Sequence, residues 1–319
     1  MMRHTPSVDV PPRPRAEDDF EQRRRAVRAK LHTAIEAGHR SDGLAAAMHH
    51  VVAGGHLWRA LFVLAVYEAA ARRPWTDVVD CACAIELIHC SSIAIDDLPC
   101  IDDAATRRGR VTCHRVYGEA ITIYTSHALV ATADRLIGAR ARHDGMASGR
   151  LSLELAKVRR DLISGQMLEM ALARGAVPAD TKTLVRLCLL KGTGFRAAGI
   201  VAGRLAQCPP AVFRDILTLS SRVSIIYQLA DDLADATLTA AAIGKGVGMD
   251  AGKRNFVTAR GAGPARAMLD GFCEDARRAL NRLPAPHPVE RLFGHMRTVG
   301  VRLEGSGSET LSDPQVAAT

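Results

Sequence analysis

Apolar and polar residues recur along most of this chain at helical spacing, and no stretch shows the sustained alternation of a strand. We predict helices over residues 17–37, 57–71, 77–97, 118–142, 148–174, 179–206, from 211 onwards, and 266–283. Glycines and prolines separate several of them, at Gly54-Gly55, Pro74, Pro99 and Pro209-Pro210. The pattern predicts an all-α fold, a bundle of long helices with a site between facing helices.

The two ends of the chain differ in composition from the rest. Residues 1–16 are rich in proline and charge and predict a disordered segment, whereas residues 304–319 are polar, Ser/Gly-rich and predict a flexible tail. Residues 17–303 are therefore expected to form one domain. Met1–Arg15 lacks the apolar stretch of a signal peptide, and no apolar run approaches the ~20 residues of a membrane span, so we expect neither.

Two groups of carboxylates each follow an apolar helical run. Residues 96–103 hold four aspartates in eight positions, too many unpaired charges for a packed core, so we expect them where a buried helix opens onto a cavity. In the second group, Asp231 and Asp235 are four residues apart and share one face of a helix. Either group alone is typical of a solvated helix face. Two groups facing each other would bind hard cations through oxygen, and those cations would bind phosphate.

The residues around the first group carry a family resemblance. The stretch Glu86-Leu87-Ile88-His89, followed by Asp96-Asp97-x4-Asp102 and Arg107-Arg108-Gly109, resembles the trans-isoprenyl diphosphate synthases, which include the farnesyl and geranylgeranyl diphosphate synthases. Gln228 and Asp231-Asp232-x-x-Asp235 resemble the family's second motif. The resemblance spans roughly residues 20–300. It implies an isoprenoid-synthase bundle around a central cavity and a homodimer.

The resemblance also implies roles for single residues. Mg²⁺, as three ions, would be held by Asp96, Asp97, Asp102, Asp231, Asp232 and Asp235 and would assist departure of an allylic diphosphate. Arg107, Gln228, Lys245 and Lys253 would lie near that diphosphate, and His56, Arg59, His89 and Arg108 near the diphosphate of isopentenyl diphosphate. The catalytic group would comprise Asp96, Asp102, Asp231, Lys245 and Arg107. The alternatives are solvated loop lysines and, for His89, a satisfied core histidine.

The length of the product should depend on what lies one helical turn before Asp96. Ser91 and Ser92 stand there, five and four residues before it, and their small side chains leave the path of a growing prenyl tail open. We therefore expect a C20 product if the protein elongates. Tyr124, on a helix expected to face these serines, is the residue most suited to shorten it.

Charge and cysteine content narrow the setting. The net charge is +8 but aromatic residues make up only 4%, so we expect a basic protein that handles diphosphates and binds no nucleic acid. Arg23, Arg24 and Arg25 are expected on the solvated face of the first helix. The eight cysteines show no Cys-x-x-Cys spacing, so we interpret them as core thiols in a reducing cytosol rather than as a zinc site.

Three departures from the family pattern put part of the site in doubt. Where the family has Gly-Gly-Lys-Arg-x-Arg-Pro, this chain begins with Gly54-Gly55 and keeps Arg59. It has His56 in place of the lysine and Leu57 in place of the first arginine. The lysine of a later Lys-Thr-Gly pattern falls on Leu190, unless a one-residue slip places Lys191 there. Ser126-His127 replaces a common Gly-Asp.

These departures leave three functions open. The first is a geranylgeranyl diphosphate synthase-like prenyltransferase that binds isopentenyl diphosphate weakly. The second is a terpene-synthase-like lyase that ionises a prenyl diphosphate without it. The third is a non-catalytic, regulatory partner of an active synthase, which the intact acidic groups argue against, because an inactive chain has no need of clustered charge.

Overall fold

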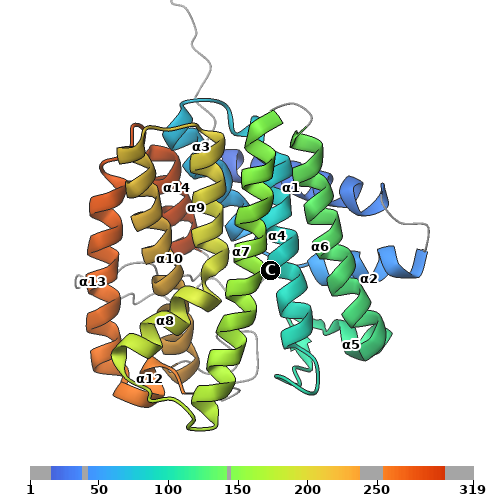
Figure 1. The fold of residues 1–319 in the computed structure, drawn as a ribbon, viewed down its shortest axis with the longest axis vertical. Helices are drawn as coiled ribbons and strands as arrows, with labels where there is room; N and C mark the ends of the chain where they lie inside the picture. The colour runs from blue at the N-terminus through green and yellow to red at the C-terminus, as the bar shows by residue number, and fades with distance from the viewer. Residues whose placement is uncertain (1–15, 38–41, 142–144, 238–253, 299–319) are drawn as a thin grey trace, which may run out of the picture.

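The computed structural model describes residues 16–37, 42–141, 145–237 and 254–298 (Figure 1). Its helices are α1 Ala16–Glu36, α2 Asp42–Val52, α3 Trp58–Ala71, α4 Val79–Asp96, α5 Cys113–Tyr117, α6 Glu119–Ala141, α7 Gly145–Ala173, α8 Thr181–Lys191, α9 Thr193–Leu205, α10 Pro210–Thr237, α12 Phe256–Arg260, α13 Ala262–Leu280 and α14 His287–Thr298. A 3₁₀ turn, Trp75–Val78, leads into α4. The ends predicted to be disordered or flexible lie outside these residues, except Ala16.

The predicted all-α bundle is confirmed, although the structure adds the helices α2, α5 and α12 and changes the bounds of others. The segment 179–206, predicted as one helix, is divided at Gly192 into α8 and α9. A Cβ atom at Gly192 would lie 2.6 Å from the carbonyl oxygen of Ser224, so only glycine lets this junction approach α10 so closely. The helix predicted at 266–283 begins earlier, at Ala262, and α14 follows it.

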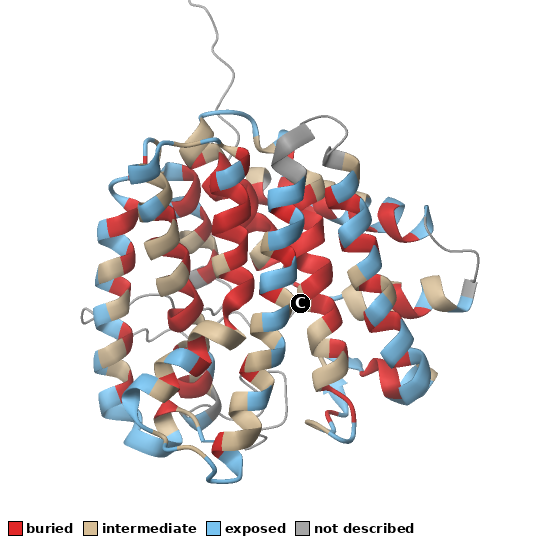
Figure 2. Cartoon of the chain, viewed as in Figure 1, coloured by how far each residue is buried: buried red, intermediate tan, exposed pale blue. Residues whose placement is uncertain are grey.

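The apolar core runs along α3 and α4. Every residue from Ala60 to Tyr67 on α3 is buried, as is every residue from Cys81 to Ile88 on α4. Figure 2 shows this burial as a red centre enclosed by helices whose outer faces are pale blue. Because α4 is buried on all sides over this length, its carboxylates can reach an opening only near the end of the helix.

The same burial accounts for a helical stretch with the composition of a membrane span. In the described part of the chain, Trp75–Asp96 is long and apolar enough to cross a membrane, with a mean hydropathy of 1.7 over the tested window, contrary to our expectation that no run approaches that length. Of that window, 67% is buried inside the protein, as in the central helix of a bundle. Length and composition alone are therefore weak evidence for a span.

Two of the three arginines predicted to be solvated are buried. The Arg23 side chain is only 2% exposed, and its guanidinium donates to Asp19 and to Glu68. Arg24 is buried as well, whereas Arg25 is exposed. The prediction failed because carboxylates on neighbouring turns and helices compensate the charges, and a helical pattern does not reveal such partners.

A short hairpin follows α4. Strand β1, Thr106–Arg107, pairs antiparallel with β2, Arg110–Val111, around Arg108 and Gly109. Both turn residues have positive φ, 54° and 71°, as a type I′ turn requires. Arg107 therefore lies on the strand, and Arg108 lies in the turn itself.

Candidate active site

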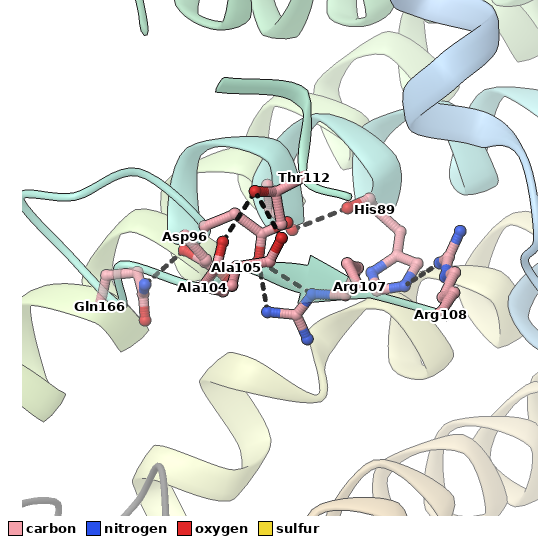
Figure 3. Close-up of polar contacts among 10 residues, drawn as sticks. His89, Asp96, Ala104, Ala105, Arg107, Arg108, Thr112 and Gln166 are labelled. Carbon is pink, nitrogen blue, oxygen red and sulfur yellow. Dashed lines mark hydrogen bonds and ion pairs between the residues drawn. The ribbon is translucent and has the colours of Figure 1, made fainter. Parts of the chain in front are cut away.

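The end of α4 and the loop after it bring two of the predicted acids together. The amide of Asp102 donates to the carbonyl of Asp96 at 3.0 Å, and the amide of Ala104 donates to the carbonyl of Asp97 at 3.2 Å. Thr112 on the far side of the hairpin closes the loop by donating to Ala104 at 2.7 Å (Figure 3). These bonds fold the chain back on the helix end, so the charge of Asp102 acts on Asp96.

Asp96 is the acid most strongly perturbed by this arrangement. Burial raises the pKa of Asp96 to about 6, and the charges of Asp102 and Glu169 add to the effect, whereas Lys191 opposes it. Gln166 on α7 donates a hydrogen bond to its carboxylate (Figure 3). Burial and a neighbouring acid make the ionised form of Asp96 unfavourable, so a bound cation would stabilise that form.

Two other predicted metal ligands do not face this opening. The Asp97 side chain is 6% exposed and accepts from Nε of Arg107 at 2.9 Å. Asp232 is also buried and accepts from Gln228 at 2.9 Å. In the metal-free chain both carboxylates therefore take part in internal hydrogen bonds, and their predicted role as metal ligands stays a prediction. Arg107, predicted to clamp a diphosphate, pairs with Asp97 in the ligand-free chain, and its predicted role stays a prediction.

The second acidic group lies on the last turns of α10. Its member Asp231 is exposed. Both α4 and α10 run toward the lower end of the bundle in Figure 1, so the two groups occupy the same end of the molecule. The side chain of Asp235 lies outside what the structure describes, as do Lys245 and Lys253, and their predicted roles stay predictions.

Lys191 occupies the position that the one-residue slip would give it. It is the last residue of α8, and its Nζ lies 2.6 Å from both carboxylate oxygens of Glu169 on α7. Its charge also lowers the pKa of Asp96. The structure therefore favours the alignment that places the lysine of the family pattern on Lys191 rather than on Leu190. Sequence reasoning gave no role to Gln166 or Glu169, since neither follows an acidic group in the chain.

A second set of charged groups lies around His89, about two turns before the end of α4. Nε2 of His89 lies 2.9 Å from Nη1 of Arg59. The same atom lies 3.4 Å from Nη2 of Arg108 (Figure 3). We call these three residues the basic cluster. Burial, followed by the charges of Arg59 and Arg108, lowers the pKa of His89 well below its usual value. The imidazole is therefore neutral and accepts from both arginines. Nη1 of Arg108 is buried without a partner among the described residues.

Glycines make room for both arginines of the basic cluster. A Cβ atom at Gly55 would lie 2.6 Å from Nη1 of Arg108, and one at Gly194 would lie 2.7 Å from Nε of Arg59. The guanidinium of Arg59 also lies 4.9 Å from the ring centre of Phe195, a cation–π contact that fixes its direction. In the sequence, the Gly54-Gly55 pair therefore indicates the basic cluster as strongly as the cationic residues that follow it do.

Only one of the two substituted positions faces the basic cluster. His56 is exposed, and burial, Arg24 and Arg108 all lower its pKa. Leu57 is 3% exposed, packs in the core and has a φ of 60°, which is uncommon for a leucine. The inferred loss of cationic charge stays a prediction at both positions, and of the two only His56 has Arg108 close enough to lower its pKa.

Two residues missed by sequence reasoning add charge beside His56. Nη2 of Arg24 on α1 lies 2.8 Å from Nε2 of His295 on α14. The ring of Trp58 connects them to His56: it stacks on His56 at 5.4 Å, and the Arg24 guanidinium lies 5.2 Å from its centre. No sequence signal links α1 to α14, because the contact forms only when both helices pack on α3.

An apolar recess adjoins these polar groups. It is lined by Arg59, Ile85, Ile88, His89, Val158, Leu162, Lys191 and Gly194. Ile85 and Ile88 of α4 share a face with Ser92 and Asp96, at spacings of three and four residues. Val158 and Leu162 share a face of α7 with Gln166 in the same way. The facing helices are thus polar at the Asp96 end and apolar behind it.

The predicted chain-length residues separate in this geometry. Ser91 is buried, its backbone carbonyl accepts from Ser126 on α6, and it is not among the residues that line the recess, so it lies beside α6. Ser92 lies on the same face as Asp96, in line with the recess. Tyr124 lies on α6, the helix that contacts α4 through Ser126, but its side chain is 68% exposed in the isolated chain, so its predicted effect on product length stays a prediction.

Comparisons with known sequences identify the family of this chain. The sequence pattern of the family described as polyprenyl synthetase matches residues 41–260. The farnesyl diphosphate synthase of Bacillus subtilis (strain 168) is 31% identical over 270 residues, covering 82% of this chain and 90% of that protein. Geranylgeranyl pyrophosphate synthase 4 of Arabidopsis thaliana is 28% identical over 238 residues, covering 72% of this chain and 63% of that protein.

Solved structures share the fold. The geranylgeranyl pyrophosphate synthetase of Pyrococcus horikoshii Ot3 matches with a TM-score of 0.80 at 22% identity, covering 90% of this chain and 98% of that one. The geranyltransferase of Helicobacter pylori, crystallised with magnesium and isoprenyl diphosphate, matches with a TM-score of 0.76 at 21% identity, covering 92% and 99%. The isoprenoid-synthase fold is confirmed, and with a family pattern that spans more than half of its length, the chain belongs to the polyprenyl synthetase family.

Proposed function

We propose that this chain is a Mg²⁺-dependent prenyltransferase that joins an allylic prenyl diphosphate to isopentenyl diphosphate. The observation that carries the proposal is that α4 contributes to two separate charged groups, the acidic group at Asp96 and the basic cluster at His89, each of which could hold a diphosphate, the first through metal ions. Asp96 ends α4, and His89 of the basic cluster precedes it by seven residues. That spacing is roughly 10 Å along the helix axis, which leaves room for two diphosphates with a reacting carbon between them.

The donor set at the first anion site fits magnesium. Mg²⁺ takes oxygen ligands and binds phosphate together with one or two carboxylates. Asp96, Asp102 and the exposed Asp231 would hold it, with Asp235 by resemblance, and we propose three ions. When bound, Mg²⁺ neutralises the departing diphosphate. Gln166 keeps the Asp96 carboxylate in place, and Lys191 adds a positive charge beside it.

The proposed reaction exchanges one bond for another. The C1–O bond of the allylic substrate breaks, and diphosphate leaves with the electron pair. The double bond of isopentenyl diphosphate attacks C1 and forms the new carbon–carbon bond, and the released diphosphate takes up the proton that is then lost. Arg59 and Arg108 would hold the second diphosphate, while the isoleucines of the recess keep water from the allylic cation.

The lyase alternative is retained because of His56. The ligand-free protein holds the pKa of His56 below its usual value, through burial and the nearby Arg24 and Arg108, so this replacement for lysine is neutral at pH 7. Arg24 and His295 supply positive or donor groups nearby, which supports binding of the second diphosphate. Whether the second substrate is used therefore decides between the two functions.

One assay separates these functions. Diphosphate release is measured from geranyl and farnesyl diphosphate with saturating Mg²⁺, with and without isopentenyl diphosphate. A prenyltransferase releases diphosphate at its full rate only with isopentenyl diphosphate and forms a product five carbons longer. Equal release without it would establish the lyase, and no release in either case would overturn both.

Variants of the acidic groups complete that assay. Asp96→Asn and Asp231→Asn should each lower the rate by at least a hundredfold, since each removes a carboxylate from the proposed metal site. Asp103→Asn is the matched control: Asp103 belongs to the same motif, but its side chain is 65% exposed and asparagine tolerates its positive φ. Its rate should stay within about twofold of the wild type.

Three finer features accompany the proposal. A C20 product is supported by the small Ser92 side chain in line with the recess. A symmetric homodimer is supported by large apolar side chains exposed on α6 and α7, among them Ile121, Tyr124, Ile163 and Met167. A cytoplasmic location is supported by the eight cysteines, all of which are free thiols.

A further inference from the structure

Two histidines and a glutamate meet where α1 approaches α2, and none of them belongs to the candidate active site. His32 and Glu36 stand four residues apart on the last turns of α1, and His49 lies on α2. In Figure 1, α2 lies at the right-hand side of the bundle, near the end of α1. Nothing in the proposed prenyl transfer uses these side chains.

The three side chains already lie within reach of a single ion. One ligand atom from each residue can be chosen so that all three lie within 4.8 Å of one another. Nε2 of His49 lies 2.6 Å from Oε1 of Glu36, and the ring centres of His32 and His49 are 4.7 Å apart. The i, i+4 spacing on α1 places His32 and Glu36 on one helix face, and α2 supplies the third group opposite.

We propose that His32, Glu36 and His49 form a binding site for a first-row divalent metal ion of the Zn²⁺ class. Imidazole nitrogen with one carboxylate is a ligand set that suits zinc, whereas magnesium prefers oxygen alone. Zinc–ligand bonds of 2.0–2.2 Å place tetrahedral ligand atoms about 3.3 Å apart. Because His32 and Glu36 are exposed, small side-chain rotations reach that spacing. Water fills the remaining position.

The site would act as a clip between two helices. Residues 38–41 are the direct chain connection between α1 and α2, and a metal ion would add a second one. His50, the neighbour of His49, lies 2.7 Å from the carbonyl of Val111 on β2. A fixed α2 would thereby also steady the hairpin whose turn carries Arg108. The main consequence is greater thermal stability of the full chain.

The test is zinc binding by the full-length protein, measured by isothermal titration calorimetry with several millimolar Mg²⁺ present, so that the aspartate groups are occupied. Cobalt(II) absorption in the visible range reports the ligand set independently. The wild type should bind one more ion per chain than either His32→Ala or His49→Ala, and Zn²⁺ should raise its Tm by several degrees. Both variants should lose at least tenfold in affinity and most of the shift in Tm.

Two comparisons make the result decisive. His287→Ala is the matched control, because His287 pairs with Glu290 at 2.8 Å on α14 but belongs to no three-ligand group among the described residues. It should bind zinc like the wild type. His32→Ala leaves the His49–Glu36 contact intact, so a purely structural ion pair would make it behave like the wild type. That outcome, or equal zinc stoichiometry in all variants, would overturn the proposal.

Discussion

Nη1 of Arg59 on α3 lies 2.9 Å from Nε2 of His89 on α4, so a neutral imidazole accepts a hydrogen bond from a guanidinium in the protein interior. The same nitrogen faces Arg108 at 3.4 Å. His89 thus spaces two cations that would otherwise repel each other, and it leaves Nη1 of Arg108 without a partner among the described residues. This nitrogen of Arg108 is therefore available to donate to a diphosphate before the substrate binds.

Replacing His89 tests this spacing role. His89→Gln keeps an acceptor near the position of Nε2, so the KM for isopentenyl diphosphate should change by less than about fivefold. His89→Leu removes the acceptor and should raise that KM by ~10- to 100-fold, the value of one or two hydrogen bonds to charged groups. Steady-state kinetics with each substrate varied in turn measures the effect. Equal KM values in the two variants would contradict the role.

The raised pKa of Asp96 predicts a stability change in metal-free protein. Its pKa is about 6 in the folded chain against 3.8 as the usual value, so the folded state holds the proton more tightly. Stability contributed by the protonated form is present at low pH and is lost as the pH rises from about 4 to 6. Asp96→Asn should therefore unfold at a higher temperature than the wild type at pH 7.5, and the difference should shrink toward pH 4.

The size of that difference follows from the shift. About two pKa units correspond to roughly 3 kcal/mol if the burial is complete. We therefore expect Asp96→Asn to raise the free energy of unfolding at pH 7.5 by about 1–3 kcal/mol. Denaturant unfolding in EDTA at pH 4, 5.5 and 7.5 measures it, with Asp103→Asn as the exposed control. An Asp96→Asn variant less stable than the wild type at pH 7.5 would mean that the carboxylate is not strained.

His56 and Leu57 should respond differently to restoration of the family residues. His56→Lys returns a fixed charge beside Arg108 and should lower the KM for isopentenyl diphosphate about 10- to 100-fold, with little effect on the allylic substrate. Leu57→Arg should mainly destabilise the protein, because Leu57 is buried. Kinetics and thermal unfolding of the two single variants separate these effects. An improved KM in Leu57→Arg would show that this side chain reaches the substrate.

The charge of His56 also predicts a pH dependence. Its pKa is lowered in the ligand-free protein by burial and by Arg24 and Arg108, so protonation requires a pH below the usual 6.5. The protonated form binds a diphosphate better, and the affinity for isopentenyl diphosphate should rise as the pH falls from 7.5 toward 6. His56→Lys should remove that rise. A wild-type profile as flat as that of the variant would exclude a contact between His56 and the substrate.

Product length should respond to Ser92 more than to Ser91. Ser92 lies in line with the recess, so Ser92→Phe should block the path and shift products from C20 toward C15. Ser91 packs toward α6, so Ser91→Phe should lower stability by ~1–3 kcal/mol through overpacking and leave product length unchanged. Chromatography of the products and thermal unfolding measure both. A Ser91→Phe variant that shortens the product would reverse this assignment.

The helices and the acidic groups could be predicted from the sequence because their signals are local. Apolar spacing identified α3, α4, α6 and α7 within a few residues of their observed bounds. The density of charge at residues 96–103 was enough to place a polar opening at the end of α4. These properties depend on neighbours within about one helical turn, which a linear pattern contains.

The direction of each side chain was decided by tertiary structure. Asp96 opens toward α7 while the adjacent Asp97 turns inward to Arg107, and Ser92 faces the recess while Ser91 lies beside α6. Burial of Arg24 depends on His295, which lies 271 residues away. Whether a charge or hydroxyl is exposed, paired or buried depends on the free energy of packing against distant helices, and no local spacing specifies that. The sequence by itself therefore determined which chemistry this end of the bundle holds, and packing determined which residues perform it.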